Sequence, residues 1–323
     1  MFQEINIPSD DGISSLHFLP ETGEQLCVTA WSGNLTIYSI ENLQKIFETK
    51  FPSPLLCSTW SDEQDVVCGA VDGKIYTKNG QILEKHTKGV CSVGFIKAVD
   101  VFFSASWDGY VHFWFPGDEE PLHSHNVGQK IVAACSNSNH VVVCTAKNTV
   151  VVLDLTKPEA ITVEQRISSL QMQIRAICPS YPEEYGWAVS SIDGRVAIEY
   201  FGDLKSQAQR FSFHSHRKEE EERTIVYPIN ALCFHPKEGT LVSGCSGGMV
   251  NFWDLKNKNK LQPIPFQFET SISALEFSPD GNFLAISASY MFDKGNIQHP
   301  SDRLILYKVT DENIKSFKQD EIN

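Results

Sequence analysis

Two arginines and two tryptophans are the residues of this sequence best placed to do chemistry, and that chemistry is binding. Arg175 stands at the start of one apolar strand pattern, and Arg195 directly follows an Asp-Gly turn. A guanidinium group donates two parallel hydrogen bonds to a carboxylate or a phosphate, so a fixed pair of arginines can hold an acidic segment. The alternative is that each arginine pairs with a structural acid of this chain, such as Asp193 or Glu199.

Trp31 and Trp107 each stand just before a predicted tight turn. Trp31 follows the alternation of Leu26, Val28 and Ala30, so its side chain falls outside the buried register of that strand. Exposed aromatic side chains at equivalent positions of a repeat are typical of binding hot spots. The alternative is that each indole packs against a neighbouring repeat.

Catalytic and metal-binding patterns are nearly absent. The sequence has no G-x-x-x-x-G-K-[ST], G-x-G-x-x-G, H-E-x-x-H or G-x-S-x-G motif. The pairs His123-x-His125 and His214-x-His216 each offer two imidazoles, but neither has a third ligand at metal spacing. Asp118–Glu120 has the character of a solvated loop. We therefore expect no metal site, no cofactor and no enzymatic activity.

An apolar triplet with the spacing i, i+3, i+5 recurs seven times along the chain, four times clearly and three times in weaker form. Each copy is followed by a second apolar run, a tight turn and a third strand pattern. The copies are Ile13/Leu16/Phe18, Leu55/Ser58/Trp60, Val90/Val93/Phe95, Ile131/Ala134/Ser136, Ile174/Ile177/Pro179, Ile229/Leu232/Phe234 and Ile272/Leu275/Phe277.

The distance from triplet to turn is nearly constant. Gly33 follows Ile13 by 20 residues, Asn148 follows Ile131 by 17, and the other turns fall between these limits. They are Gly73, Gly109, Gly194 and Gly248. The strand Val250–Asp254 then ends in a literal Trp-Asp pair, the signature of WD repeats. Units of about 40 to 45 residues with four strands each form propeller blades. We predict an all-β, seven-bladed WD-repeat β-propeller over residues 1–309.

The two ends of the chain depart from the repeat. In the seventh unit Asp302 stands 30 residues after Ile272, which leaves an insertion of about ten residues around Met291–Pro300. The segment Phe2–Ile7 has no unit of its own, so we expect it to supply the outer strand of the last blade and close the ring. Residues 310–323 are predicted to form a flexible charged tail.

The composition excludes several classes of protein. A net charge of −13 disfavours a general binder of nucleic acid or anionic membranes, because such partners would approach against the net field. No segment reaches the roughly 18 apolar residues of a spanning helix, and the start of the sequence does not resemble a signal peptide. The nine scattered cysteines suit buried positions in a reducing compartment. Arg217–Arg223 is interpreted as a solvated connecting loop.

Five runs of residues make the sequence resemble one family. They are Ile192–Tyr200, His216-Arg217, Tyr227–Ala231, Ala288–Met291 and His299-Pro300. With them the chain resembles the Bub-type spindle-checkpoint propellers over essentially its whole length. The related Rae-type messenger-RNA export propellers share the Gly-Arg-Val-Ala-Ile run and the His-Arg pair, whereas the Tyr-Pro-Ile-Asn run, Glu199 and the Tyr-Met pair favour the checkpoint branch.

The resemblance implies a non-enzymatic adaptor that binds the GLEBS motif of a checkpoint kinase or pseudokinase on one face. Matched by position, Trp31 and Trp107 correspond to aromatic contacts with that motif, and Arg175 to the arginine that holds its paired glutamates. Arg195 corresponds to the residue that reads phosphothreonine in repeats of a kinetochore scaffold.

One position departs from the family pattern. The second cation beside the phosphate is replaced by His214, and a neutral imidazole contributes less than a permanent charge. Phosphate binding is therefore expected to be weaker or more dependent on pH than in relatives, with Lys218 as a speculative substitute.

The implied role is recruitment of checkpoint kinases to kinetochores by a monomeric propeller within a hetero-complex. The implied locations are the nucleus, the kinetochore and the cytoplasm, with no direct contact to nucleic acid or membrane. The nearer alternative is an export propeller that binds a nucleoporin GLEBS motif. The farther alternative is an enzyme in the central channel, which a buried cluster of carboxylates or histidines there would favour.

Overall fold

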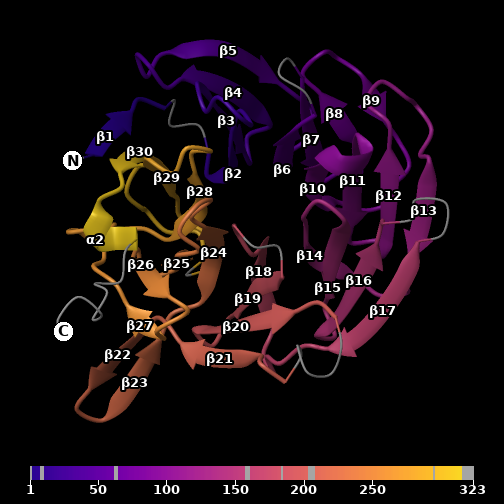
Figure 1. Ribbon diagram of the computed structural model, residues 1–323. Coiled ribbons are helices and arrows are strands. Elements are labelled where there is room, and N and C mark those ends of the chain that lie inside the picture. The colour runs from indigo at the N-terminus through magenta and orange to yellow at the C-terminus, as the bar shows by residue number, and fades with distance from the viewer. Residues whose placement is uncertain are drawn as a thin grey trace.

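The described residues form a ring of seven four-stranded antiparallel sheets, the blades of a β-propeller (Figure 1). The predicted fold class is confirmed. This computed structural model describes residues 2–7, 11–61, 65–156, 161–182, 185–202, 208–293 and 295–314.

The first four blades follow one another along the chain. Blade one contains β2 (Ile13–Phe18), β3 (Gln25–Ala30), β4 (Asn34–Ser39) and β5 (Lys45–Lys50). Blade two contains β6 (Leu55–Trp60), β7 (Val66–Ala70), β8 (Ile75–Thr77) and β9 (Ile82–Leu83). Blade three contains β10 (Val90–Ile96), the 3-10 turn η1 (Lys97–Val99), β11 (Val101–Ser106), β12 (Tyr110–Trp114) and β13 (His123–Asn126). Blade four contains β14 (Ile131–Ser136), β15 (His140–Thr145), β16 (Thr149–Asp154) and β17 (Thr162–Ile167).

The remaining blades carry the departures from the repeat. Blade five contains β18 (Ile174–Pro179), β19 (Gly186–Ser191), β20 (Arg195–Tyr200) and β21 (Phe211–His214). A separate hairpin, β22 (Arg217–Glu220) and β23 (Arg223–Val226), precedes blade six. Blade six contains β24 (Ile229–Phe234), β25 (Leu241–Cys245), β26 (Val250–Asp254) and β27 (Asn259–Lys260). Blade seven contains β28 (Ile272–Phe277), β29 (Phe283–Ala288), β30 (Arg303–Lys308) and β1 (Phe2–Ile5), and helix α2 (Asp311–Ile314) follows β30.

Every predicted triplet coincides with the innermost strand of a blade. Each inner strand also shifts register between its first and third residues, as between Ile174 and Ala176 of β18. Such a bulge leaves the second residue outside the ladder and re-aims its side chain. In blade five that second residue is Arg175.

The predicted tight turns are also present. All six turn residues have a positive φ, from 91° at Gly109 to 58° at Asn148. Asn148 is the one residue of the six that has a side chain, and Asn tolerates this left-handed conformation better than most residues. The turn positions were therefore predictable from residue type.

The N-terminal strand closes the ring, as predicted. Phe2–Ile5 pairs antiparallel with Leu304–Tyr307 of β30, so the first strand of the chain is the outer strand of the last blade. Ile5 is 1% exposed and packs with Leu16 of blade one and Leu304 of blade seven. We call this junction between blades one and seven the seam. It buries apolar side chains that come from both ends of the sequence.

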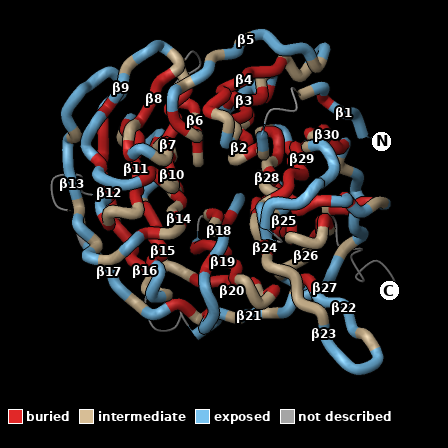
Figure 2. Tube along the Cα trace, turned by 180° about the vertical axis from the view of Figure 1, so that it is seen from behind, coloured by how far each residue is buried: buried red, intermediate tan, exposed pale blue. Residues whose placement is uncertain are grey.

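Burial falls from the middle of each blade to its rim. Figure 2 shows buried residues concentrated in the middle strands, whereas the outermost strands β5, β9, β13 and β17 are largely exposed or half-buried. Apolar clusters lie between neighbouring blades, and one joins Ile96 of blade three to Val151 of blade four. Each blade therefore depends on its neighbours for its core.

A buried polar network anchors blade three. His86 Nε2 lies 2.8 Å from Ser104 Oγ, and Trp114 Nε1 donates to the same oxygen at 2.9 Å. On its other side, His86 Nδ1 lies 3.1 Å from a carboxylate oxygen of Asp108. The Asp108 carboxylate also accepts from the backbone N–H groups of Thr87 and Tyr110 at 2.9 Å.

Blade six repeats this network with His216, one of the histidines considered above as a metal ligand. His216 is 1% exposed, and its Nε2 lies 2.9 Å from Ser243 Oγ, to which Trp253 Nε1 donates at 2.9 Å. Asn251 Nδ2 donates to the other ring nitrogen at 3.2 Å. His216 therefore has a structural role.

Acidification below pH 6.5 is expected to destabilise the fold. Burial and Lys260 lower the pKa of His216 to about 3, and burial and His86 lower the pKa of His112 to about 4. Between these values and the unfolded pKa of about 6.5, the unfolded chain binds the protons and the folded chain does not. Each of these two histidines then lowers the free energy of unfolding by up to about 1.4 kcal/mol for every unit by which the pH falls. Urea denaturation at pH 7 and pH 4.5 measures this loss.

The effect has an internal control. The His216→Gln variant is expected to show a shallower dependence of stability on pH, because one of the histidines with a strongly lowered pKa is gone. Equal slopes for the variant and the wild type would contradict the assignment.

Two segments differ in detail from the sequence expectation. Arg217–Arg223 is not a loop, because β22 and β23 pair over four residues on each strand. At the other end, Asn313 is 1% exposed and donates to the backbone oxygen of Gln262, so the start of the predicted tail lies against the propeller. Positions 315–323 lie outside the described residues, and the boundary at residue 309 stays a prediction. Among the described residues, no helix has the length and apolar character needed to span a membrane.

Candidate peptide-binding face

The candidate residues gather at one end of the propeller. We call this end the docking face, defined by the turns between the second and third strands of the blades, with Trp31, Trp107 and Arg195, and by the starts of the inner strands, with Arg175. In each of these blades the residue that follows the second strand donates a backbone hydrogen bond to the residue before the inner strand, and this bond marks the docking face. Trp31 N donates to Gly12 O, and Trp107 N to Gly89 O, both at 3.0 Å.

Trp31 presents its indole to solvent. Its residue is 41% exposed, which is unusual for so large an apolar side chain. The indole stands beside Gly12, where an added Cβ would lie 3.8 Å from Trp31 Cδ1. Trp31 is thus available to a partner.

Trp107 is half-buried, because its ring lies on the backbone of its own blade. A Cβ added to Gly89 would lie 2.7 Å from Trp107 Cε3 and Cζ3, so any other residue there would displace the indole. The ammonium of Lys130 lies 5.0 Å from the ring centroid, within the range of a cation–π contact. Trp107 therefore offers one side of its ring together with a positive charge, and sequence reasoning did not include Lys130.

Arg175 is exposed at the mouth of the ring and held by a neighbouring blade. Its Nε and Nη2 atoms donate to Oδ1 of Asn230 at 3.3 and 3.0 Å. Asn230 occupies the same bulge position in blade six and donates through Nδ2 to the backbone oxygen of Ile272 at 3.3 Å. A neutral amide thus orients the guanidinium and leaves its charge available. The acids weighed as alternatives, Asp193 and Glu199, do not appear among these bonds.

Arg195 and His214 lie directly opposite each other on β20 and β21. Arg195 Nε lies 3.3 Å from a carboxylate oxygen of Asp193, an ion pair whose two side chains are 43% and 29% exposed. Desolvation, followed by the positive charges of Arg195 and Arg217, lowers the pKa of His214. The structure therefore brings Arg195 and His214 together, with the charge of Arg217 near enough to disfavour protonation of His214.

Lys218 belongs to a different environment. It lies on β22 and forms an ion pair with Glu220 Oε1 at 3.4 Å. In the same hairpin Arg223 Nε pairs with Glu220 Oε2 at 3.0 Å. Lys218 thus supports the hairpin, whereas its neighbour Arg217 contributes charge to the group around His214.

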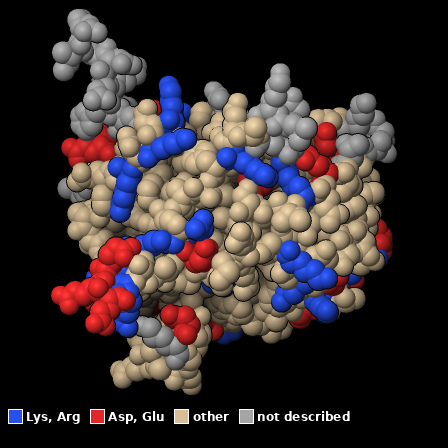
Figure 3. All heavy atoms as spheres, turned by 90° about the horizontal axis from the view of Figure 1, so that it is seen from below, with Lys and Arg blue, Asp and Glu red and all other residues tan. Residues whose placement is uncertain are grey.

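The buried acid Glu199 is also structural. It is 1% exposed, and one of its carboxylate oxygens accepts from the backbone N–H of Ser169 at 2.9 Å. Figure 3 shows Lys and Arg side chains spread over one side of the propeller, with Asp and Glu gathered where the β22–β23 hairpin projects.

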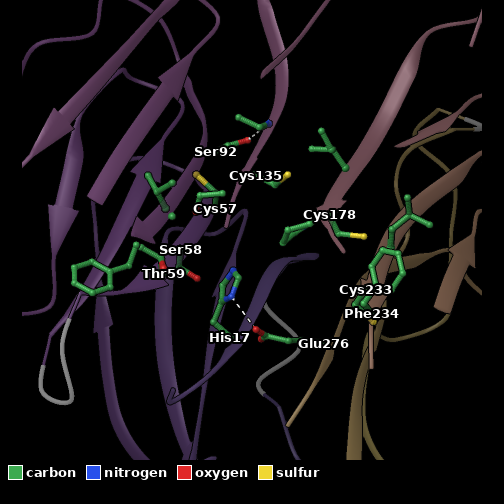
Figure 4. Close-up of a pocket in the computed structure, with 18 of the residues that line it drawn as sticks. His17, Cys57, Ser58, Thr59, Ser92, Cys135, Cys178, Cys233, Phe234 and Glu276 are labelled. Atoms are coloured by element: carbon green, nitrogen blue, oxygen red, sulfur yellow. Dashed lines mark hydrogen bonds and ion pairs between the residues drawn. The ribbon is translucent and has the colours of Figure 1, made fainter. Parts of the chain in front are cut away.

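A cavity of about 460 Å³ lies in the central channel, at the ends of the inner strands away from the docking face. Figure 4 shows Cys135, Cys178 and Cys233 facing it from three different strands, and His17 pointing at Glu276. His17 Nδ1 lies 3.2 Å from Glu276 Oε1. Burial opposes protonation of His17, but the carboxylate outweighs it and raises the pKa. This pair links the inner strands of blades one and seven.

The channel lining does not support catalysis through its thiols. Burial raises the pKa of Cys135, Cys178 and Cys233 well above the ordinary value, and a protonated thiol is a poor nucleophile. Among the residues that the structure describes, no group of three or more His, Cys, Asp or Glu side chains is arranged to hold a metal ion.

Known proteins resemble this chain in sequence. The family model described as "WD domain, G-beta repeat" matches residues 77–114 and 220–254. The chain is 30% identical over 322 residues to the mitotic checkpoint protein bub3 of Dictyostelium discoideum, covering 97% of this chain and 96% of that relative. It is 32% identical over 286 residues to the spindle assembly checkpoint protein bub3 of Schizosaccharomyces pombe, covering 86% of this chain and 88% of that relative.

Two further likenesses are broader. The poly(A)+ RNA export protein of Schizosaccharomyces pombe is 29% identical over 328 residues, covering 97% of this chain and 92% of that relative. The solved structure of U3-55K has a TM-score of 0.80 at 17% identity and covers 95% of this chain and 98% of that one. At that identity the likeness of structures shows the propeller fold alone.

Proposed function

The chain belongs to the bub3 family of mitotic checkpoint WD-repeat propellers, and we propose on this basis that it is a non-enzymatic adaptor of the spindle assembly checkpoint. It holds the GLEBS motif of a checkpoint kinase or pseudokinase on its docking face and recruits that partner to kinetochores. A phosphothreonine in a scaffold repeat provides the attachment point. The adaptor works as a monomer within a hetero-complex in nucleus and cytoplasm, with no cofactor and no direct contact to nucleic acid or membrane.

The observation that carries this proposal is the setting of Arg175. A chain with net charge −13 repels acidic segments in general, so it can hold one only through local, preorganised cations. The guanidinium of Arg175 is fixed by Asn230 Oδ1, a neutral acceptor, so this contact leaves its positive charge uncompensated. Lys130 above Trp107 adds a second positive charge on the same face. Paired glutamates of a partner fit this arrangement.

Phosphate reading is assigned to Arg195 with Arg217, in place of Lys218. A phosphate carries close to two negative charges at pH 7 and is best met by permanently charged, bidentate donors. Arg217 directly follows His216, which the buried network of blade six holds in place. His214, whose lowered pKa disfavours its charged form, contributes a hydrogen bond and gains positive charge as the pH falls.

Calorimetric titration tests both assignments. We expect the purified protein to bind a GLEBS-type peptide first and then a Met-Glu-Leu-phosphothreonine peptide, with little binding of the unphosphorylated twin. Arg195→Ala is expected to weaken phosphopeptide binding by about 10- to 100-fold, because a charge-assisted bidentate contact is lost. The same variant should leave GLEBS binding unchanged.

Lys218→Ala serves as the matched control, since its ammonium pairs with Glu220 in the hairpin. It is expected to bind the phosphopeptide like the wild type. Equal affinity of the protein for the phosphorylated and unphosphorylated peptides would remove phosphate reading from the proposal.

The export function remains a second candidate, because the poly(A)+ RNA export protein matches nearly the full length of the chain. In that case the docking face holds a nucleoporin motif. A nuclear-rim signal of the tagged protein in dividing and non-dividing cells alike would favour export. Signal confined to unattached mitotic chromosomes would favour the checkpoint.

A further inference from the structure

The insertion of blade seven, Tyr290–Pro300, opens on the docking face. It lies between β29 and β30, the same connection that carries Trp31 in blade one. Ser289 N donates to Ser271 O at 2.9 Å, which matches the bond from Trp31 N to Gly12 O. The insertion therefore begins at the level of Trp31.

The insertion and Trp31 are neighbours across the seam of the ring. A Cβ added to Gly12 would lie 3.6 Å from Ser289 Cβ, 3.7 Å from the backbone oxygen of Tyr290 and 3.8 Å from Trp31 Cδ1. One glycine thus touches both the start of the insertion and the exposed indole.

An aromatic cluster gives the insertion its shape. The Tyr290 ring stacks on His299 with centroids 4.8 Å apart and lies 5.2 Å from the Phe292 ring. Tyr290 is 8% exposed, and its hydroxyl donates to the backbone oxygen of Gly295 at 2.9 Å. The buried tyrosine therefore ties the two ends of the loop together.

Phe292 is presented outward from this cluster. It is 55% exposed, one of the most exposed large apolar residues that the structure describes. Its φ of 55° places a bulky side chain in the left-handed region, which is rare for such residues. Strained backbone and an exposed phenyl group both cost stability, and such costs concentrate at binding sites.

We propose that Phe292 and Trp31 together form an apolar contact site for the docked GLEBS-type segment, so that the blade-seven insertion sets the direction in which that segment lies. The acids Asp11, Asp293 and Asp302 stand around this end of the docking face. They disfavour the glutamates of the segment here, whereas Arg175 attracts them across the channel. The apolar part of the segment therefore lies over Trp31 and Phe292, and its acidic part over Arg175. This inference rests on the proposed function.

Titration of a GLEBS-type peptide into Phe292→Ala tests the assignment. We expect binding about 5- to 30-fold weaker than in the wild type, the usual effect of removing an aromatic anchor. Phe115→Ala is the matched control, because Phe115 is 41% exposed but follows β12 at the opposite face of the propeller. It should bind normally. The Trp31→Ala/Phe292→Ala double variant should lose less than the product of the two single effects, since both side chains contact the same part of the peptide.

Hydrogen exchange on the wild-type protein gives an independent measurement that needs no folded variant. Peptide binding is expected to slow exchange in residues 290–300, and unchanged exchange there would overturn the inference. If Phe292→Ala binds normally while Arg175→Glu and Trp31→Ala bind weakly, the proposed function survives and this inference fails. If Arg175→Glu and Trp31→Ala also bind like the wild type, the proposed function itself fails.

Discussion

Replacing Arg175 with glutamate is expected to remove binding of a GLEBS-type peptide almost completely. Truncating one member of a desolvated, hydrogen-bonded charge pair costs about 2 to 5 kcal/mol, which is a loss of roughly 30- to several-thousand-fold in affinity. Charge reversal adds repulsion of the peptide carboxylates. The residue stands at a bulge and is oriented by Asn230, so few other cations can take its place at this position.

Arg210→Glu is the matched control for this variant. Arg210 is also exposed and also belongs to blade five, but it precedes β21 at the end of the blade away from the docking face. The two variants have the same net charge, so a difference between them reports position and not the overall field. Pull-down of a checkpoint kinase and calorimetry with the peptide both measure the effect. Wild-type binding by both Arg175→Glu and Trp31→Ala would defeat the proposed function.

Asp108→Ala is expected to cause the largest loss of stability among single substitutions of a polar residue in this fold. The carboxylate is 6% exposed and accepts hydrogen bonds from His86 and from the N–H groups of Thr87 and Tyr110. Removing it leaves these donors without their charged acceptor, at a cost of about 3 to 5 kcal/mol. The melting temperature should fall by about 5 to 15 °C in a thermal scan.

The pH dependence of this loss identifies its cause. His86 and backbone N–H bonds hold the pKa of Asp108 below its ordinary value, against the opposing effect of burial. The stability from a carboxylate with a lowered pKa is present above the unfolded pKa of about 4 and is lost as pH falls below it. The gap between wild type and variant should therefore narrow in strong acid. Asp118→Ala, on an exposed loop of the same blade, should melt within about 1 to 2 °C of the wild type.

The architecture was predictable because its signals are local and repeated. The triplet Ile229/Leu232/Phe234 marks an inner strand because its three apolar side chains pack between blade six and the neighbouring blade five. Positive φ at the turns requires Gly or Asn, so Gly33 and Asn148 could be placed from residue type. The pairing of Phe2–Ile5 followed from the physical need to cover a sheet edge.

The hairpin and the partners of the site residues were not predictable in the same way. Arg217–Arg223 has no apolar periodicity, and its strands are held by backbone pairing and by ion pairs of Glu220. The acceptor for Arg175 is Asn230, 55 residues away, and it is chosen by the packing of blade five on blade six. The sequence pattern predicts on which face of the propeller a side chain lies. Its hydrogen-bond partner, in contrast, depends on how the neighbouring blade packs.

The pairing of β1 with β30 means that the part of the docking face at the seam forms only when the last blade is complete. The strand that begins the chain has no partner until Leu304–Tyr307 has left the ribosome, so the ring cannot close on a nascent chain. Trp31 and the blade-seven insertion meet only across that seam. A chain that ends before β30 would therefore leave β1 unpaired and would not bring Trp31 and the blade-seven insertion together.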